Sequence, residues 1–89
     1  MVPDKLMACA NVLDTKGLLC PLPVIRLQEF ARHVEHETEI VVIATDPGVL
    51  ADIPSWCRVN GHVHVSSEQL DHEFHVKVRA VPPALPDEV

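Results

Sequence analysis

The sequence predicts an α+β fold, a two-layer βαβαββ sandwich in which a four-stranded mixed sheet carries two helices on one face. Three observations lead to this prediction. A β-branched run without alternation at Glu39–Thr45 is typical of a strand that is central or covered on both faces. The stretches His62–Ser66 and Glu73–Ala80 alternate polar and apolar residues, which indicates a hairpin with one face in water. Helical spacing before the central run and a proline-led helix start after it predict the helices.

The first half of the chain is expected to form a strand, a turn and a helix. A short strand at about Cys9–Asp14 follows a loose lead-in, and the turn ends at Gly17. The helix is expected over Pro21–Glu35, because prolines are tolerated in a first helical turn. Its apolar stripe consists of Val24, Leu27, Ala31 and Val34. The strand at Glu39–Thr45 should then lie parallel to the first strand, since a helix connects the two.

The second helix is expected to be shorter. Pro54 would break a helix that began directly after Asp46–Gly48, where the central strand ends. The helix is therefore expected over Ile53–Val59, with Asp52 as its N-cap. It should stop near Gly61, because glycine suits the left-handed position that ends a helix.

The hairpin is expected to lie with one face under both helices, its strands joined by Ser67–His72. The apolar residues of that face are Val63, Val65, Phe74, Val76 and Val78. Prolines from Pro82 onward cannot continue a strand, so residues 82–89 are expected to be an extended or disordered tail. The chain is thus predicted to be a single domain, 1–89, with an ordered core over about residues 9–81.

Composition argues against several functional classes. The 89 residues are enough for one modest core. The net charge is −6, and the 7 Lys and Arg residues are scattered along the chain. The chain therefore lacks the cluster of basic side chains that direct nucleic-acid binding requires. The chain has no run of about 18 apolar residues that could span a membrane, and its N-terminus does not resemble a signal peptide. Three sparse cysteines favour free thiols in a reducing cytoplasm over a disulfide framework.

The segment Gly17–Pro23 is the strongest candidate for a functional site. Cys20 directly precedes Pro21, and Pro23 follows shortly before the apolar-periodic run. Cys20 is therefore expected at or beside the helix N-cap, where free N–H groups and the helix dipole favour a nucleophilic thiolate. The alternative is a buried, inert thiol. Pro23 occupies the place of a second thiol, so a thioredoxin-like Cys-x-x-Cys cycle is not expected.

Several motifs resemble the TusA/SirA-like family of small sulfur carriers. They are Leu13-Asp14, Gly17-Leu18-Leu19-Cys20-Pro21-Leu22-Pro23, Asp46-Pro47 and Asp52-Ile53-Pro54-Ser55-Trp56-Cys57. The resemblance extends from about Val12 to Ala80 and implies the same βαβαββ fold. It also implies that Cys20 carries a persulfide and hands the outer sulfur to another protein. Such a chain would be a persulfide relay rather than a stand-alone multiple-turnover enzyme, with no cofactor and no metal.

The resemblance further implies partner proteins. The sulfur donor would be a cysteine desulfurase, a rhodanese-like protein or a DsrE-like protein, and the acceptor another sulfur-relay protein. Family members serve tRNA thiolation, cofactor sulfur supply or dissimilatory sulfur oxidation. The carrier is expected to be a cytoplasmic monomer or weak dimer that contacts neither nucleic acid nor membrane directly.

Two other functions remain open at this point. In a thiol redox or regulatory module, Cys20 would oxidise or pair with Cys57, although Cys57 is most simply a buried packing thiol. In a plain interaction domain, Cys20 would have no chemical role. Lys16 and Arg26 lie within reach of the Cys20 end and could attract an acidic partner or support a thiolate.

The chain has 6 histidines, an unusual number for its length. His62, His64 and His75 are expected to share the open face of the hairpin. A metal site is not expected there, because too few fixed ligands converge and no carboxylate completes a set.

Overall fold

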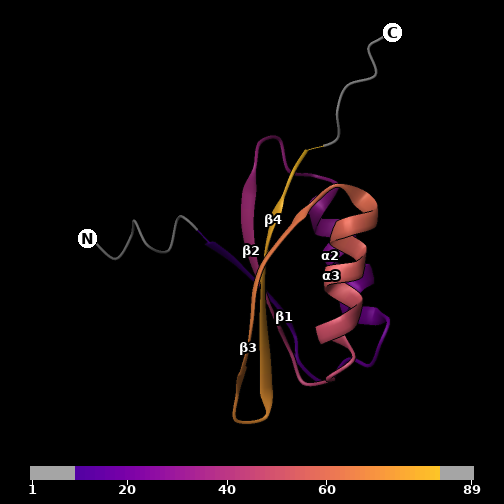
Figure 1. The fold of residues 1–89 in the computed structure, drawn as a ribbon, viewed down its shortest axis with the longest axis vertical. Coiled ribbons are helices and arrows are strands. Elements are labelled where there is room, and N and C mark those ends of the chain that lie inside the picture. The colour runs from indigo at the N-terminus through magenta and orange to yellow at the C-terminus, as the bar shows by residue number, and fades with distance from the viewer. Residues whose placement is uncertain (1–9, 83–89) are drawn as a thin grey trace, which may run out of the picture.

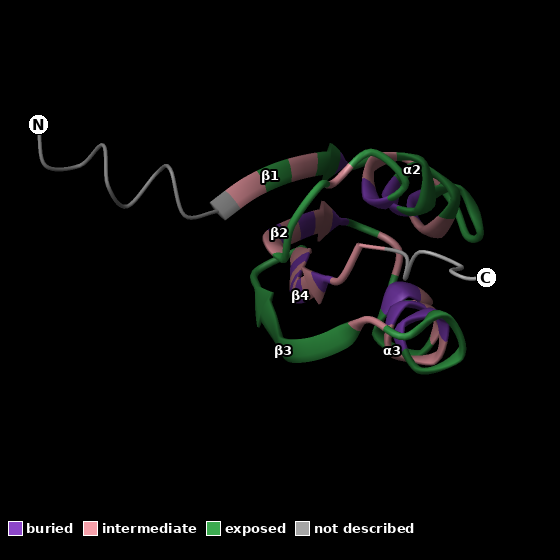
Figure 2. Ribbon diagram, turned by 90° about the horizontal axis from the view of Figure 1, so that it is seen from above, coloured by how far each residue is buried: buried purple, intermediate pink, exposed green. Residues whose placement is uncertain are grey.

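The computed structural model describes residues 10–82 and has a four-stranded sheet in the order β1-β2-β4-β3 (Figure 1). The elements are β1 (Ala10–Thr15), α2 (Leu22–Ala31), β2 (Thr38–Ala44), α3 (Val49–Asn60), β3 (Val63–Leu70) and β4 (Glu73–Ala80). β1 pairs with β2 in parallel, whereas the other neighbouring strands are antiparallel. Both helices lie on one face of the sheet (Figures 1 and 2). The predicted α+β fold with βαβαββ order is therefore confirmed.

The core lies between the two helices and the central strands. Alternate residues of β2 and β4 point toward the helices and are buried, among them Val42, Val76 and Val78 (Figure 2). Leu27 on α2 and Ile53 on α3 are also completely buried. The unbroken apolar run of β2 predicted a strand that is either central or covered on both faces. The strand order shows that β2 is central.

The prediction for the face of β3 is wrong. Val63 and Val65 are 44% and 41% exposed rather than covered. The reason is register: Val63 lies opposite Arg79 and so faces away from the helices, and a bulge between His64 and Ser66 changes the alternation beyond it. β3 also ends at Leu70 rather than at Ser66, so the connection shrinks to residues 71–72.

Both helices differ from their predicted bounds. α2 ends at Ala31 instead of Glu35. α3 begins at Val49, with Gly48 as its N-cap, so Asp52 is not a cap and Pro54 lies inside the helix. Pro54 has no N–H to donate to the carbonyl of Leu50, four residues earlier, but Leu50 is 39% exposed, so water can reach this part of the helix. The expected end is confirmed, because Gly61 adopts a left-handed φ of 79°.

Other expectations concern parts of the chain outside the described residues. Cys9 and residues 83–89 of the predicted tail lie there. Between residues 10 and 82, neither helix is long and apolar enough to cross a membrane.

Candidate functional site

The candidate site forms where the loops after β1 and β2 meet. The two strands are parallel, so their carboxyl ends lie at the same edge of the sheet. The Gly17 N–H donates to Thr45 Oγ1 at 2.9 Å, and the Cys20 N–H donates to Asp46 Oδ2 at 2.7 Å. The buried Thr15 hydroxyl also donates to the Ile43 carbonyl at 2.8 Å. The first two bonds join the segment that carries Cys20 to the loop between β2 and α3, and the third joins the end of β1 to β2.

Gly17 makes the turn after β1 possible. Its φ of 85° is in the left-handed region, which other residues adopt at a cost. The turn is closed by a hydrogen bond from the Leu18 N–H to the Thr15 carbonyl at 3.1 Å. The chain is thereby directed from the sheet into the segment that leads to α2.

Cys20 is exposed, but its electrostatic environment is the opposite of the one predicted. As predicted, Cys20 lies beside the N-cap of α2, which is Pro21, and the Cys20–Pro21 peptide bond is cis. The Cys20 thiol donates a hydrogen bond to Asp52 Oδ2. This hydrogen bond is the main cause that raises the pKa of Cys20, with desolvation and the negative charges of Asp52 and Asp46 adding to it. The predicted environment that favours a thiolate is therefore wrong, because the contacts of Cys20 favour the thiol over the thiolate.

Asp46 holds the backbone around this thiol. Its Oδ2 accepts the Cys20 N–H, and its Oδ1 accepts the Gly48 N–H at 3.0 Å. These two bonds, the one from Cys20 first, lower the pKa of Asp46 below its ordinary value. The residue is thus a firmly ionised carboxylate that fixes both loops.

Gly48 lies against Cys20. A Cβ added at Gly48 would be 3.4 Å from the Cys20 Cβ and 3.7 Å from its Sγ. The absence of a side chain at this position leaves space beside the sulfur atom.

The sequence reasoning missed the part that Asp46 and Asp52 play at this site, because it treated both as helix caps. Parallel pairing was the available signal. When two parallel strands are neighbours, polar residues that follow each strand meet at one edge of the sheet. Applied to the loops after β1 and β2, this rule would have placed Asp46 next to Cys20.

Lys16 and Arg26 do not join the thiol. Lys16 Nζ forms ion pairs with Asp14 and with Glu73, each at 3.8 Å. Arg26 is an exposed residue on α2 and adds nothing to the shift in the Cys20 pKa. The charges that act on the sulfur are therefore the two carboxylates.

Cys57 is buried in the core, as expected of a packing thiol, and is 1% exposed. Burial raises its pKa to about 11. Its environment therefore differs from that of Cys20, which is open to solvent.

Stability should consequently fall at high pH. The pKa of Cys57 is raised in the folded chain, so its contribution is fully present below the unfolded pKa of 9.0 and is lost as pH rises toward about 11. We expect a loss of up to roughly 2 kcal/mol in the free energy of unfolding. Urea unfolding at pH 8 and pH 11 measures it. The Cys57→Ala variant is the control, and an equal loss in that variant would contradict the assignment to Cys57.

The three histidines do not share one face, so this prediction is also wrong. His62 stacks on Trp56 with ring centroids 4.5 Å apart. His64 bonds to Ser67 at 2.8 Å, and His75 bonds to Glu73 at 3.1 Å. Within residues 10–82, no three His, Cys, Asp or Glu side chains are arranged to hold a metal ion.

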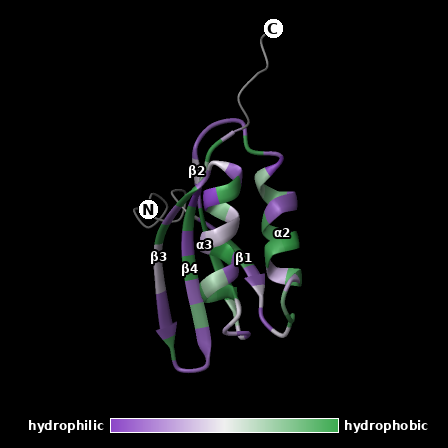
Figure 3. Cartoon of the chain, turned by 45° about the vertical axis from the view of Figure 1, so that its right-hand side comes forward, coloured by the Kyte–Doolittle hydropathy of each residue, from purple (hydrophilic) through white to green (hydrophobic). Residues whose placement is uncertain are grey.

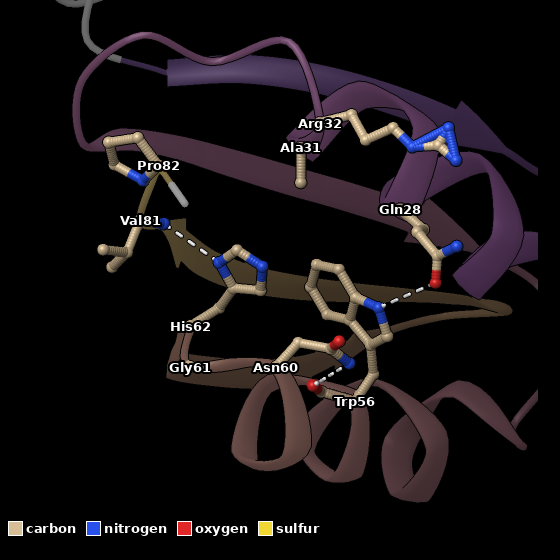
Figure 4. Close-up of a pocket in the computed structure, with 9 residues that line it drawn as sticks. All are labelled: Gln28, Ala31, Arg32, Trp56, Asn60, Gly61, His62, Val81 and Pro82. Atoms are coloured by element: carbon tan, nitrogen blue, oxygen red, sulfur yellow. Dashed lines mark hydrogen bonds between the residues drawn. The ribbon is translucent and has the colours of Figure 1, made fainter. Parts of the chain in front are cut away.

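A cavity of about 580 Å³ lies between the C-terminal parts of both helices and the end of β4 (Figure 4). Its wall includes the Trp56–His62 stack, and the Val81 N–H donates to His62 Nδ1 at 2.9 Å (Figure 4). Burial lowers the pKa of His62. The wall contains no cysteine, so the cavity is separate from the Cys20 site.

Comparison with known proteins identifies the family of the chain. The model of the family described as sulfurtransferase TusA matches residues 11–80. A candidate sulfur carrier protein of Neisseria meningitidis serogroup A is 33% identical over 70 residues, which cover 79% of this chain and 95% of that protein. A candidate sulfur carrier protein of Aquifex aeolicus is 42% identical over 61 residues, which cover 68% of this chain and 31% of that protein. The chain therefore belongs to the TusA sulfurtransferase family.

Proposed function

We propose that this chain is a sulfur carrier that accepts a sulfane sulfur as a persulfide on Cys20 and relays it to a partner protein. The observation that carries the proposal is the exposed Cys20 thiol held at the junction of two loops, with free space beside it at Gly48. Membership of the TusA family and the names of the relatives support a sulfur carrier role.

Both steps of the relay are displacements at sulfur. Cys20 Sγ attacks the outer sulfur of a donor persulfide, the donor S–S bond breaks, and the donor leaves as a thiol. In the second step a thiol of the acceptor attacks the outer sulfur on Cys20, and Cys20 leaves as a thiol. The sulfane sulfur changes hands without an external oxidant or reductant.

The surroundings of Cys20 favour a partner protein over a small substrate. Cys20 lines neither the cavity beside Trp56 nor a second cavity, of about 510 Å³, beside Phe30 and Val34. The neighbourhood carries large exposed apolar side chains instead: Leu19, Leu22, Ile25 and Leu50. Part of the loop that leads into α2 is accordingly coloured hydrophobic in Figure 3. Such side chains around a reactive atom suit a docking protein, which would exclude water from the transfer.

The proposal extends to the partners and the setting. A cysteine desulfurase, a rhodanese-like protein or a DsrE-like protein would donate the sulfur, and another relay protein would accept it. The net charge of −6 disfavours direct contact with nucleic acid, so RNA modification would be served through the acceptor. The free thiols suit a reducing cytoplasm, and the chain would act as a monomer or weak dimer.

A redox module that pairs Cys20 with Cys57 has less support. Cys57 is buried and its pKa is raised to about 11, so it is a poor partner for disulfide exchange in the folded chain.

Sulfur loading tests the proposed function. The reduced chain is incubated with glutathione persulfide and analysed by intact mass spectrometry and peptide mapping. We expect one added sulfur atom, located on Cys20. Loss of two hydrogens would indicate a disulfide, and an unchanged mass would indicate no thiol chemistry; either result would contradict the carrier function.

Alkylation should distinguish Cys20 from Cys57. The pKa values of both thiols are raised, so solvent exposure decides the difference in rate. Limited iodoacetamide at neutral pH should label Cys20 at least about tenfold faster than Cys57, since Cys20 is exposed and Cys57 is buried. Peptide mapping after short reaction times measures the ratio. Faster labelling of Cys57 would show that the thiol at the start of α2 is not the reactive one.

A further inference from the structure

The two carboxylates near Cys20 have different contacts. Asp46 uses both oxygen atoms to accept backbone N–H groups, so it acts on the geometry of the loops. Asp52 is half-buried on α3 and accepts the hydrogen bond of the Cys20 thiol itself. Within residues 10–82, no basic side chain forms an ion pair with Asp52. The Asp52 carboxylate therefore contacts the sulfur and is not neutralised by a described basic side chain.

We propose that Asp52 is the proton shuttle of the sulfur transfer. This inference rests on the proposed function, because it concerns the proton that must leave Cys20 before its sulfur can form a new bond. The thiol and Asp52 Oδ2 are already in hydrogen-bond contact, which is the geometry that a general base requires.

The loading step balances with Asp52 as the only proton carrier. Cys20 Sγ forms a bond to the outer sulfur of the donor R–S–SH as its own proton moves to the Asp52 carboxylate. The R–S bond to the outer sulfur breaks, and the electron pair stays on R–S⁻. Protonated Asp52 then gives its proton to R–S⁻, which leaves as R–SH. The products are Cys20–S–SH, R–SH and an ionised Asp52.

The same residue serves the release step in reverse. When an acceptor thiol attacks the outer sulfur, Cys20 becomes the leaving group and needs a proton. Asp52 takes the proton of the acceptor thiol and returns it to Cys20 Sγ, which restores the resting hydrogen bond. One carboxylate beside one sulfur is thus sufficient for both directions, as microscopic reversibility requires.

The alternative is that Asp52 only keeps the thiol protonated. The charged groups that act on Cys20 are Asp52 from α3 and Asp46 from the loop after β2, and both raise its pKa. A carboxylate with no further role would then merely slow every reaction of this cysteine, sulfur loading included. The two roles predict opposite effects of removing the carboxylate on sulfur loading.

Two reactions of the Asp52→Asn variant separate these roles. Alkylation by iodoacetamide consumes free thiolate, so its rate at Cys20 should rise about twofold or more at pH 7 when the carboxylate is removed. Loading from glutathione persulfide should fall by about tenfold to a hundredfold, because general acid–base catalysis is lost. The pH profile should also change. Wild-type loading should vary little between pH 6 and 8, whereas loading of the variant should rise with pH in parallel with its alkylation.

Two further variants complete the test. Asp52→Glu keeps a carboxylate on a longer side chain and should recover part of the loading rate. Glu37→Gln removes one negative charge in the exposed loop between α2 and β2 and should match the wild type in both reactions. Thermal melting of each variant confirms that it is folded.

Each outcome decides the role of Asp52. If loading and alkylation both rise in Asp52→Asn, the residue only holds the thiol proton and the shuttle is overturned. If both fall, Asp52 serves to orient the thiol, and the shuttle is overturned as well. If the wild type accepts sulfur and Asp52→Asn loads at the same rate, this inference is rejected and the proposed function stands. Wild-type protein that accepts no sulfur rejects the proposed function.

Discussion

Replacement of Cys20 by serine is expected to abolish sulfur loading and to leave the thermal unfolding transition nearly unchanged. The substitution is almost isosteric and the site is exposed, so little packing is lost. The serine hydroxyl can donate to Asp52 as the thiol does. The serine side chain cannot hold a sulfane sulfur, because a persulfide contains an S–S bond and serine has an oxygen atom in place of the sulfur. Intact mass spectrometry after incubation with glutathione persulfide measures loading, and calorimetry or circular dichroism measures unfolding.

Cys57→Ala is the matched control for this experiment. It also removes one thiol, but from the core rather than from the loop, and Cys20 should load in it as in the wild type. Loading that persists in Cys20→Ser would move the carrier function to Cys57 or Cys9. A collapse of the melting transition in Cys20→Ser would show that Cys20 is needed for the fold, which would undermine the mechanism proposed for it.

The largest expected effect on stability comes from Leu27→Ala. Leu27 is 0% exposed on α2, where it packs in the core between this helix and the sheet. Removal of a fully buried leucine side chain costs roughly 2–5 kcal/mol, since transfer energy is lost and a cavity remains. That cost is a large share of the roughly 5–15 kcal/mol that stabilises a typical domain. Urea denaturation should therefore show a much lower midpoint, with the start of α2 and Cys20 loosened as a result.

Leu22→Ala provides the comparison for this prediction. It removes the same atoms from the same helix, but Leu22 is 42% exposed. The expected loss is below about 1 kcal/mol, because much of the side chain is already in water. Equal losses in the two variants would mean that α2 does not pack on the sheet through Leu27.

The sequence predicted the layered fold because its signals are local. The alternation of Glu73–Ala80 identifies the buried face of β4 by itself, and Phe74, Val76 and Val78 are indeed buried. The apolar run at Glu39–Thr45 likewise indicated a strand that is central or covered on both faces, and β2 is central. In each case neighbouring residues carry the pattern, and one face of the sheet must be covered for the chain to fold.

Features that depend on pairing between distant residues could not be predicted in this way. One extra residue at the bulge between His64 and Ser66 changes which side chains of β3 face the helices, and no local pattern signals it. The acidic environment of Cys20 depends on Asp46 and Asp52, which are 26 and 32 residues away in the chain. The helix start suggested a thiolate, but a carboxylate in direct contact outweighs a helix dipole, whose effect is modest at an exposed site.

The bulge in β3 also bears on self-association. Among the strands of residues 10–82, β3 is at the end of the order, so one row of its backbone N–H and C=O groups has no neighbouring strand there. Such an edge is a template on which a second copy could add a strand and begin edge-to-edge polymerisation. Here the bulge between His64 and Ser66 interrupts the regular ladder of β3. In the part of β3 that follows the bulge, the exposed Glu68 adds a negative charge. We therefore expect that concentrated protein keeps its sheet at four strands and does not grow into fibrils through this edge.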